Sequence, residues 1–305
     1  MNWKNDISAA SDRIAGHAQI TPVMQSAAFE LGYPVEMKLE HMQHTGSFKA
    51  RGAFNTLLSM NVPAAGVVAA SGGNHGAAAA YAAQSLGYPA KIFVPELAGP
   101  SKISLIRKTG ADLSVVSGEY ANALTEAQAY EEATGAMQIH AYDAPATVAG
   151  QGTCFAEWDR QGLEADTVLI AVGGGGLIAG ALAWYQGARK VVAVEPETSC
   201  ALNAALKAGH PVDVTVSGIA ANALGARRIG SICFELAQGI ASVLVPDEAI
   251  TQAQQMLWYS HRILVEPAGA TALAALISGA YKPEPGERVA VLICGGNISP
   301  DPLAS

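Results

Sequence analysis

The chain has 305 residues, of which half are hydrophobic and only 14% are charged, so it is long enough for two globular domains. This composition excludes a disordered chain. The formal net charge of −8 and the calculated pI of about 5.3 argue against a nucleic-acid-binding surface, and no basic cluster offsets them.

The four cysteines, Cys154, Cys200, Cys233 and Cys294, show no paired spacing. Because no CxxC pair occurs, neither a disulfide framework nor a zinc cluster is expected. The N-terminal residues lack an apolar signal core, and no run of about 18 apolar residues is present to cross a membrane. We therefore expect a reduced, cytoplasmic protein with no membrane partner.

Hydrophobic periodicity predicts helices and strands that alternate along the chain. Helices are expected at about 7–17, 26–31, 76–86, 101–109, 146–160, 176–185 and 247–263. Two further helices are expected to begin at 49 and at 269, and another is expected to end at 133. Strands are expected at 35–39, 67–70, 91–94, 113–116, 138–140, 167–172, 191–194, 242–245 and 289–293. The region 200–240 is expected to be helical and rich in loops. Several strands are continuous Val, Ile and Ala runs, which is typical of parallel sheets covered on both faces.

Lys49 lies in the stretch TGSFKARG (45–52), where a predicted strand turns into a helix. Ser47 is a candidate N-cap for that helix. A helix start favours anions, so an ammonium there is expected to have a lowered pKa and to act as a nucleophile or base. The alternative is an ordinary solvated lysine.

Glycine-rich turns follow the carboxyl ends of four predicted strands, at 46–49, 71–76, 173–176 and 294–297. Ligands of open α/β sheets bind at such positions. The four consecutive glycines at 173–176 predict a phosphate cradle, because bare backbone N–H groups at a helix start attract anions. The alternative is a simple tight turn.

A second interpretation of the same region is a dinucleotide-binding unit. Gly174, Gly176 and Gly180 follow a strand, and Glu195 lies 21 residues after Gly174, near the spacing of a ribose-binding acid. A nicotinamide-dependent dehydrogenase would leave Lys49 and the other glycine turns unexplained, so it stays the second choice.

The turn at 71–76 precedes a helix, and its N–H groups, the Ser71 hydroxyl and the Asn74 amide suit a carboxylate or phenolate oxygen. His75 alone is weak evidence for a site. His41 and His44 have a spacing that could suit a metal, but solvated side chains are the better interpretation. No GxSxG elbow, Walker loop or EF-hand loop occurs.

Eight motifs occur in a single order along the chain. They are Lys38-Leu39-Glu40, the stretch 45–53, the turn 71–76, Gly150-Gln151-Gly152-Thr153, the four glycines, Val194-Glu195-Pro196, Glu266-Pro267 and the turn 294–297. Together they resemble the serine/threonine dehydratases and serine racemases among the fold type II (tryptophan-synthase-β-like) pyridoxal-phosphate enzymes. The resemblance covers essentially the whole chain.

The resemblance implies a site for pyridoxal 5'-phosphate and for an amino-acid substrate. Its implied cofactor residues are Lys49 as the covalent attachment point, Phe48 beside the ring, Asn74 at the 3-hydroxyl oxygen, Gly173, Gly174, Gly175, Gly176 and Leu177 around the phosphate, and Cys294 at the pyridine nitrogen. The implied substrate residues are Ser71, Gly72, Asn74 and His75, which receive the carboxylate. An ordinary buried thiol is the alternative for Cys294.

Three positions depart from the family pattern. Racemases of this family carry a serine base where Gly72 stands, which favours elimination over racemisation here. The family's cation site often has an acid at the position of Ala201, so Glu195 and the Ser199 carbonyl are left to hold a monovalent or divalent cation. Tyr142 replaces an asparagine that some relatives place near the cofactor. Glu266, in a matching Glu-Pro turn, is a further candidate neighbour of the site.

The implied fold is a larger domain from 1–53 and 145–305 with a smaller domain inserted at 54–144 and the cofactor between them. The implied activity is α,β-elimination of a β-hydroxy amino acid, such as L-threonine or L-serine, to a 2-keto acid and ammonia. Alternative activities are a dehydratase for 3-hydroxyaspartate or a 3-arylserine, and a serine racemase. A homodimer is also implied, and because the chain ends at Ser305, without length for a regulatory domain, a catabolic role is expected.

Overall fold

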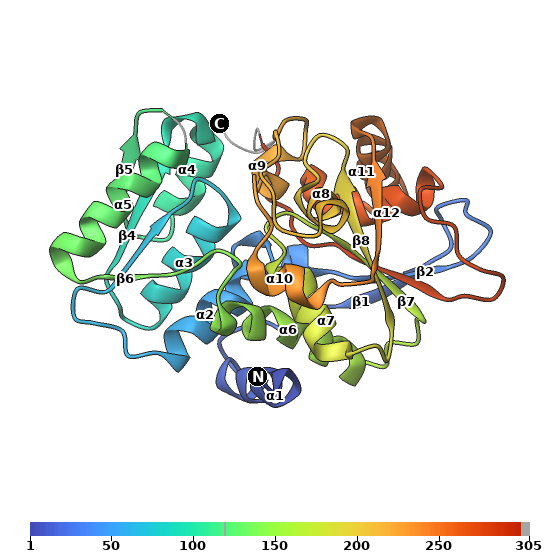
Figure 1. Cartoon of the computed structure of the whole chain (residues 1–305), viewed down its shortest axis with the longest axis horizontal. Helices are drawn as coiled ribbons and strands as arrows, with labels where there is room; N and C mark the ends of the chain where they lie inside the picture. Colours follow the sequence, from blue (N-terminus) through green and yellow to red (C-terminus); the bar gives the residue numbers. More distant parts are fainter. Residues whose placement is uncertain (119, 300–305) are drawn as a thin grey trace.

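Two sheets, each covered by helices, make up the described part of the chain, residues 1–118 and 120–299 of a computed structural model (Figure 1). The larger sheet has the strand order β1-β2-β10-β7-β8-β9, and the smaller sheet has the order β5-β4-β3-β6. Every neighbouring pair is parallel except β1 with β2. The prediction of an α/β protein with two mostly parallel sheets is confirmed.

The strands and helices have the following bounds. The larger sheet contains β1 (Val23–Ser26), β2 (Val35–Lys38), β7 (Thr167–Ala171), β8 (Lys190–Pro196), β9 (Ala241–Val245) and β10 (Val289–Leu292). The smaller sheet contains β3 (Val67–Ala70), β4 (Ala90–Pro95), β5 (Asp112–Val116) and β6 (Met137–Gln138). The α-helices are α1 (Trp3–Arg13), α2 (Lys49–Ser59), α3 (Asn74–Ser85), α4 (Pro100–Arg107), α5 (Tyr120–Thr134), α6 (Pro145–Arg160), α7 (Gly176–Tyr185), α8 (Ala201–Ala208), α9 (Ala221–Leu224), α10 (Ser231–Leu236), α11 (Asp247–His261) and α12 (Pro267–Ile277). Short 3-10 turns are η1 (Glu40–Met42), η2 (His44–Gly46) and η3 (Glu96–Ala98).

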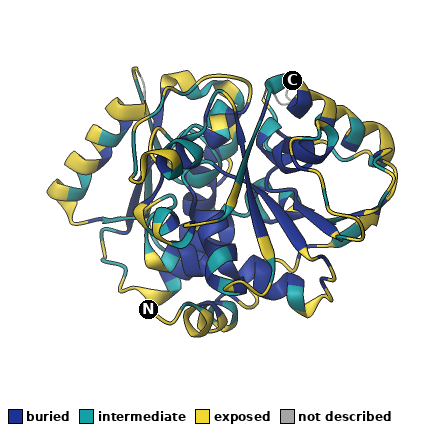
Figure 2. Ribbon diagram, turned by 45° about the vertical axis from the view of Figure 1, so that its right-hand side comes forward, coloured by how far each residue is buried: buried dark blue, intermediate teal, exposed yellow. Residues whose placement is uncertain are grey.

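Burial explains why the strands could be located from their apolar runs. All five residues of β7 and all four of β3 and β10 are buried. Figure 2 shows the central strands and the helices at the centre of the molecule as buried, with exposed residues on the outer helices and turns. None of the described helices has the length and apolar character needed to cross a bilayer.

The predicted helix at 26–31 is wrong. Ser26 is the last residue of β1, which pairs antiparallel with β2 in the register Ser26 to Val35. The connection contains Glu30 and Gly32 at φ of 57° and 79°, a left-handed conformation that a right-handed helix cannot include. Pairing with a neighbouring strand therefore outweighs the local helical pattern.

The smaller sheet lies entirely within 54–144 and the larger sheet outside it. Helix α2 crosses the predicted boundary at residue 53 and packs on both α3 and α6. The division into 1–53 with 145–305 and 54–144 stays a prediction.

Helix α3 is packed almost entirely through alanine. Six of its alanines have no exposed surface: Ala77, Ala78, Ala79, Ala80, Ala82 and Ala83. Four of these are consecutive, so the helix is buried on all its faces over 77–80, whereas Gln84 and Ser85 at its end are exposed. Because the side chain of each of these residues is a single methyl group, the neighbouring elements approach the α3 backbone closely.

A cluster of four buried charges joins β2, α2 and α6. The Arg51 guanidinium donates to both oxygens of Glu40, at 2.7 and 2.8 Å, and to both oxygens of Glu157, at 2.9 and 3.0 Å. The Lys38 ammonium donates to Glu157 Oε1 at 2.5 Å and to the Thr21 carbonyl at 2.8 Å. Two cations and two anions therefore neutralise one another inside the protein.

Replacement of Arg51 by methionine is expected to lower the free energy of unfolding by about 3–5 kcal/mol, because buried Glu40 loses its cation and Glu157 keeps only Lys38. Urea unfolding followed by circular dichroism measures the change. Lys91→Met is the matched control, since Lys91 pairs with Asp112, whose side chain is 71% exposed. That control is expected to cost less than about 1 kcal/mol. Equal effects of the two substitutions would contradict the role given to the cluster.

Candidate active site

Three of the four glycine turns are joined by direct hydrogen bonds. Gly296 N donates to the Gly46 carbonyl at 2.9 Å, and Phe48 N donates to the Cys294 carbonyl at 3.2 Å. Asn74, in the turn at 71–76, accepts from the Asn297 side chain at 2.8 Å. The turns follow β2, β3 and β10, so the two sheets meet here through the carboxyl ends of their strands.

Lys49 is the first residue of α2, and its side chain is partly buried. Nζ donates to the Ala141 carbonyl at 2.7 Å and lies 5.2 Å from the centre of the Phe48 ring. Burial lowers the pKa of Lys49 to about 8, against a smaller opposing effect of Cys294. The lowered pKa agrees with the prediction from the sequence. Its main cause is burial, however, and not the position at the helix start that the prediction gave as the reason.

The prediction that Ser47 caps α2 is wrong. Phe48 occupies the N-cap position, and no side chain caps the helix. Ser47 has extended backbone angles and forms a bridge with Gly295 instead. Within the described residues, its buried hydroxyl has no hydrogen-bond partner.

The Asn74 side-chain amide is held on both sides. Its Nδ2 donates to Glu266 Oε1 at 2.5 Å, and its Oδ1 accepts from Asn297 Nδ2 at 2.8 Å. Asn297 Nδ2 also donates to the carbonyl of Thr45, at 2.7 Å. Because Glu266 accepts and Asn297 donates, the orientation of the Asn74 amide is set, and one N–H of its Nδ2 stays available for a ligand oxygen.

Asn297 was missed as a functional residue, and Glu266 was only a candidate neighbour. The signal for Asn297 was its place at the end of the turn 294–297, directly after a buried strand. Burial raises the pKa of Glu266 to about 7, against hydrogen bonding from Asn74 and the charge of Lys102.

The turn at 71–76 begins α3 and contains the predicted carboxylate-binding residues. Burial and the nearby Lys49 lower the pKa of His75 to about 3, so its ring is neutral and donates from Nε2 to the Ile139 carbonyl at 2.9 Å. Ser71 Oγ accepts from Gly73 N at 3.2 Å. A Cβ added to Gly72 would lie 2.3 Å from Ala98 Cβ, which leaves no room for a serine in this conformation.

The four glycines form a cradle that no other residue type fits. A Cβ would lie 2.9 Å from Leu224 Cα at Gly173, 2.3 Å from the Tyr142 ring at Gly174, 2.5 Å from Cys233 Sγ at Gly175, and 2.9 Å from Tyr142 Cα at Gly176. In the described chain, the amides of these glycines donate to no protein acceptor. With Leu177 in the first turn of α7, they provide free N–H groups at a helix start, which fits a phosphate.

Tyr142 connects the cradle to Lys49. Its ring covers Gly174, and the neighbouring Ala141 carbonyl accepts from Lys49 Nζ. Asp143 then accepts from the amides of Ser231 and Ile232 at the start of α10, each at 2.9 Å. This segment therefore brings the fourth glycine turn to the other three.

Cys294 is a buried neutral thiol. Its Sγ donates to the Ala268 carbonyl at 3.3 Å, and burial raises its pKa. A neutral thiol is compatible with a place beside an unprotonated pyridine nitrogen, and that role stays a prediction.

Both Glu195 oxygens are engaged in contacts within the protein, whereas the contact of Ser199 is made by its hydroxyl and not by the carbonyl that was predicted as a ligand. The two Glu195 oxygens accept from the amides of Leu202 and Asn203, each at 2.8 Å, at the start of α8, and Ser199 Oγ donates to the Leu224 carbonyl. No group of three or more His, Cys, Asp or Glu suited to a metal occurs in residues 1–118 and 120–299. A ribose would also find both Glu195 oxygens occupied, which disfavours the dinucleotide interpretation. The cation site stays a prediction that these contacts do not support.

His41 and His44 belong to no such group of three or more potential metal ligands among the described residues. Both are partly buried, and His44 Nδ1 lies 3.1 Å from the Tyr81 hydroxyl. The expectation of solvated side chains is therefore wrong in detail, since His44 packs against the Tyr81 and Phe54 rings.

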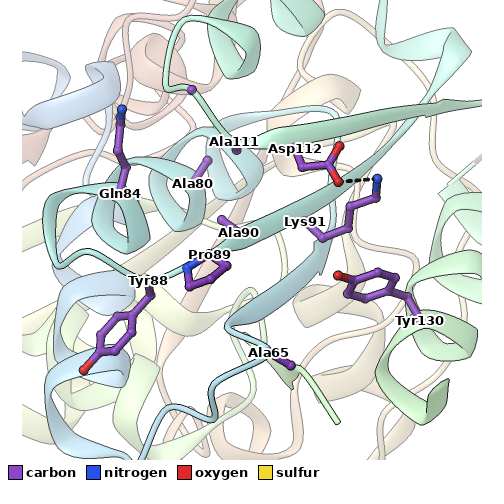
Figure 3. A pocket seen from close by; sticks show the side chains of 11 residues that line it. Ala65, Ala80, Gln84, Tyr88, Pro89, Ala90, Lys91, Ala111, Asp112 and Tyr130 are labelled. Atoms are coloured by element: carbon purple, nitrogen blue, oxygen red, sulfur yellow. Dashed lines mark hydrogen bonds and ion pairs between the residues drawn. The ribbon is translucent and has the colours of Figure 1, made fainter. Parts of the chain in front are cut away.

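One separate cavity lies away from these residues. It has a volume of about 310 Å³ and is found at the amino ends of β4 and β5, next to the pair Lys91–Asp112 (Figure 3). The glycine turns follow the carboxyl ends of the strands, so this cavity is at the opposite edge of the smaller sheet.

Comparison with known proteins points to the family that the motifs resemble. The model of the pyridoxal-phosphate dependent enzyme family matches residues 14–295. Phenylserine dehydratase of Ralstonia pickettii is 35% identical, with 96% of this chain and 93% of the relative covered, and L-threonine ammonia-lyase of Geobacter sulfurreducens is 34% identical, with 96% and 75% covered. Among solved structures, the threonine deaminase of T.th. has a TM-score of 0.89 at 35% identity (96% and 98% covered), and maize serine racemase has 0.91 at 29% (97% and 93% covered).

The lowered pKa of Lys49 predicts unusual reactivity of the cofactor-free protein. Carbamylation of Lys49 by cyanate requires the neutral amine, so its rate should rise with pH to a plateau with a midpoint near 8. The carbamylation rate of a lysine with an ordinary pKa should keep rising to higher pH, toward about 10.4. Peptide mass spectrometry measures both rates, and a common midpoint would contradict the enclosure of Lys49.

Replacement of Asn297 by aspartate should weaken cofactor binding, because a carboxylate cannot donate to Asn74 Oδ1 or to the Thr45 carbonyl. The loss of the donor that orients Asn74 is expected to raise the dissociation constant for pyridoxal phosphate roughly tenfold. Titration of the cofactor-free protein by absorbance measures it. Asn61→Asp, at an exposed position, is the control, and unchanged affinity of the Asn297 variant would count against the orienting role.

Proposed function

The chain belongs to the family of pyridoxal-phosphate-dependent enzymes, and on that premise we propose that it is a dehydratase (ammonia-lyase) acting on a β-hydroxy amino acid such as L-threonine or L-serine. The products are a 2-keto acid and ammonia, formed by α,β-elimination. The relatives named as threonine ammonia-lyase and phenylserine dehydratase support this activity class.

The cradle and the enclosed amine fit the cofactor. The amides of the four glycines and Leu177 would hold its phosphate, Asn74 its ring oxygen, and Lys49 its aldehyde carbon. When bound, pyridoxal phosphate supplies an electron sink for the bonding pair left on the substrate α-carbon.

Lys49 is the group that moves a proton. Because its pKa is lowered to about 8, a useful share of the amine is neutral near physiological pH and can accept the α-proton. Its Nζ is anchored to the Ala141 carbonyl at 2.7 Å, which keeps the amine at one place in the site. His75 stays neutral, so it adds no competing charge beside Lys49.

Gly72 carries the choice of elimination over racemisation. Racemisation needs a second base on the other side of the α-carbon, and the family resemblance puts that base at this position. A glycine has no side-chain proton to exchange, and Ala98 lies where a side chain would have to be. The position therefore supplies no second base, and departure of the β-hydroxyl is the productive outcome once Lys49 has removed the α-proton.

The side chain of the substrate is the open part of the proposal. Serine, threonine, 3-hydroxyaspartate and 3-phenylserine share the β-hydroxyl that elimination requires. The similarity to phenylserine dehydratase keeps an aryl side chain among the candidates.

The proposed setting is a homodimer in the cytoplasm with a role in amino-acid catabolism. All four cysteines are free thiols, which supports a reducing compartment. Light scattering should give a mass of about twice 31.3 kDa.

Incubation of the purified enzyme and pyridoxal phosphate with the four candidate substrates should release keto acid and ammonia from at least one of them. Lys49→Ala should abolish this release, because the attachment point of the cofactor and the base for the α-proton are lost together. Lys108→Met, at an exposed lysine, should be as active as the wild-type chain. Coupled reduction of the keto acid and an ammonia assay give the two measurements.

Chiral analysis of the remaining serine separates the alternatives. Keto-acid release should exceed formation of D-serine by a wide margin. Rapid D-serine formation would refute the role given to Gly72, and a panel with no product at all would refute the proposed activity.

A further inference from the structure

Lys102 is a buried lysine at the edge of the candidate active site. It lies on α4, which is next to the smaller sheet, and only 5% of its surface is exposed. Its Nζ donates to the carbonyl of Asn222 on α9, at 3.3 Å. Helix α4 lies beside the smaller sheet and α9 beside the larger one (Figure 1), so this hydrogen bond joins the two sides. The sequence motifs assign it no role.

The ammonium of Lys102 lacks a counter-ion. Among the described residues it makes no ion pair, and one long hydrogen bond serves its three N–H donors. Glu266 is the acid whose charge it feels, but Glu266 Oε1 is taken by Asn74. A buried cation in this condition costs free energy, and burial accordingly lowers the pKa of Lys102.

The position of Lys102 adds to a second positive feature. A Cβ placed on Gly73 would be 3.8 Å from Lys102 Nζ, and Gly73 is the N-cap residue of α3. The start of this 12-residue helix carries partial positive charge and unpaired amides. Two positive groups therefore face the same small volume, and an anion entering it would satisfy both.

We propose that Lys102 binds the α-carboxylate of the amino-acid substrate at the start of α3. The proposal rests on the proposed function, which supplies a carboxylate as the anion. Lys102 thus contributes a charge to a site whose other predicted carboxylate contacts, Ser71, Asn74 and the neutral His75, carry none. In this position it selects α-amino acids over their uncharged amides and brings α4 against the bound substrate.

The test compares two small probes of similar shape, one with a carboxylate and the other with a neutral carboxamide. 3-Hydroxypropanoate carries the carboxylate and β-hydroxyl but no amine, and 3-hydroxypropanamide is its neutral counterpart. The wild-type holoenzyme should bind the acid more tightly than the amide in isothermal titration. Lys102→Met should weaken binding of the acid about 10- to 100-fold and leave binding of the amide within about twofold. Lys102→Arg should keep the preference for the acid.

A second measurement distinguishes this role from a structural one. Methionine keeps the apolar stem and removes the unpaired charge, so Lys102→Met should keep or raise the thermal midpoint of unfolding. Lys108→Met, on an exposed residue just after α4, is the control and should alter neither binding nor the midpoint. KM for L-serine or L-threonine should rise in Lys102→Met with a smaller change in kcat.

Three results would overturn the proposal. One is equal binding of acid and amide by the wild-type enzyme, and another is an unchanged preference in Lys102→Met. The third is a loss of affinity in Lys102→Met that is confined to 3-hydroxyaspartate. That result would assign Lys102 to the side-chain carboxylate of the substrate instead of its α-carboxylate. If the wild-type enzyme releases no keto acid while Lys102→Met still loses the acid preference, the proposed activity fails and the carboxylate site stands.

Discussion

The buried contacts of Arg51 hold the elements of the site in their relative positions. Arg51 lies two residues after Lys49 on α2, and its guanidinium contacts Glu40 from the β2 side and Glu157 on α6 with two hydrogen bonds each. Such paired contacts restrict both the distance and the rotation of the groups they join. They therefore fix the first turn of α2 against β2 and α6. Buried ion pairs often add little net stability, so orientation of α2 is the contribution that matters here.

Much of the fold could be predicted from the sequence because the buried strands are continuous apolar runs. The strands β3, β7 and β10 lie within one or two residues of their predicted bounds, and the glycine turns follow them as expected. The exceptions arise where distant pairing decides local structure. Residues 23–26 form β1 because β2 supplies a partner, and Ser47 is drawn into a bridge with Gly295 instead of capping α2. Local patterns contain no information on such partners.

The residues of the candidate site could be proposed from the sequence, but the hydrogen bonds between them could not. The glycine cradle and Lys49 could be recognised because their chemistry demands particular residue types at a strand end. The contacts of Asn74 join residues 192 and 223 positions apart in the chain, to Glu266 and Asn297. Lys102 gave no signal at all, since only its burial in the folded chain distinguishes it from a surface lysine.

The alanine packing of α3 bears on how proteins with this architecture diverge. Asn74 and His75 are the first residues of the helix, and the buried alanines follow them. A larger residue at these alanine positions would overpack the interior, and a glycine would destabilise the helix. The buried positions of α3 therefore accept very few residue types besides alanine. Evolution toward a new substrate side-chain preference is therefore expected to change the surrounding loops and to leave the interior of α3 as it is.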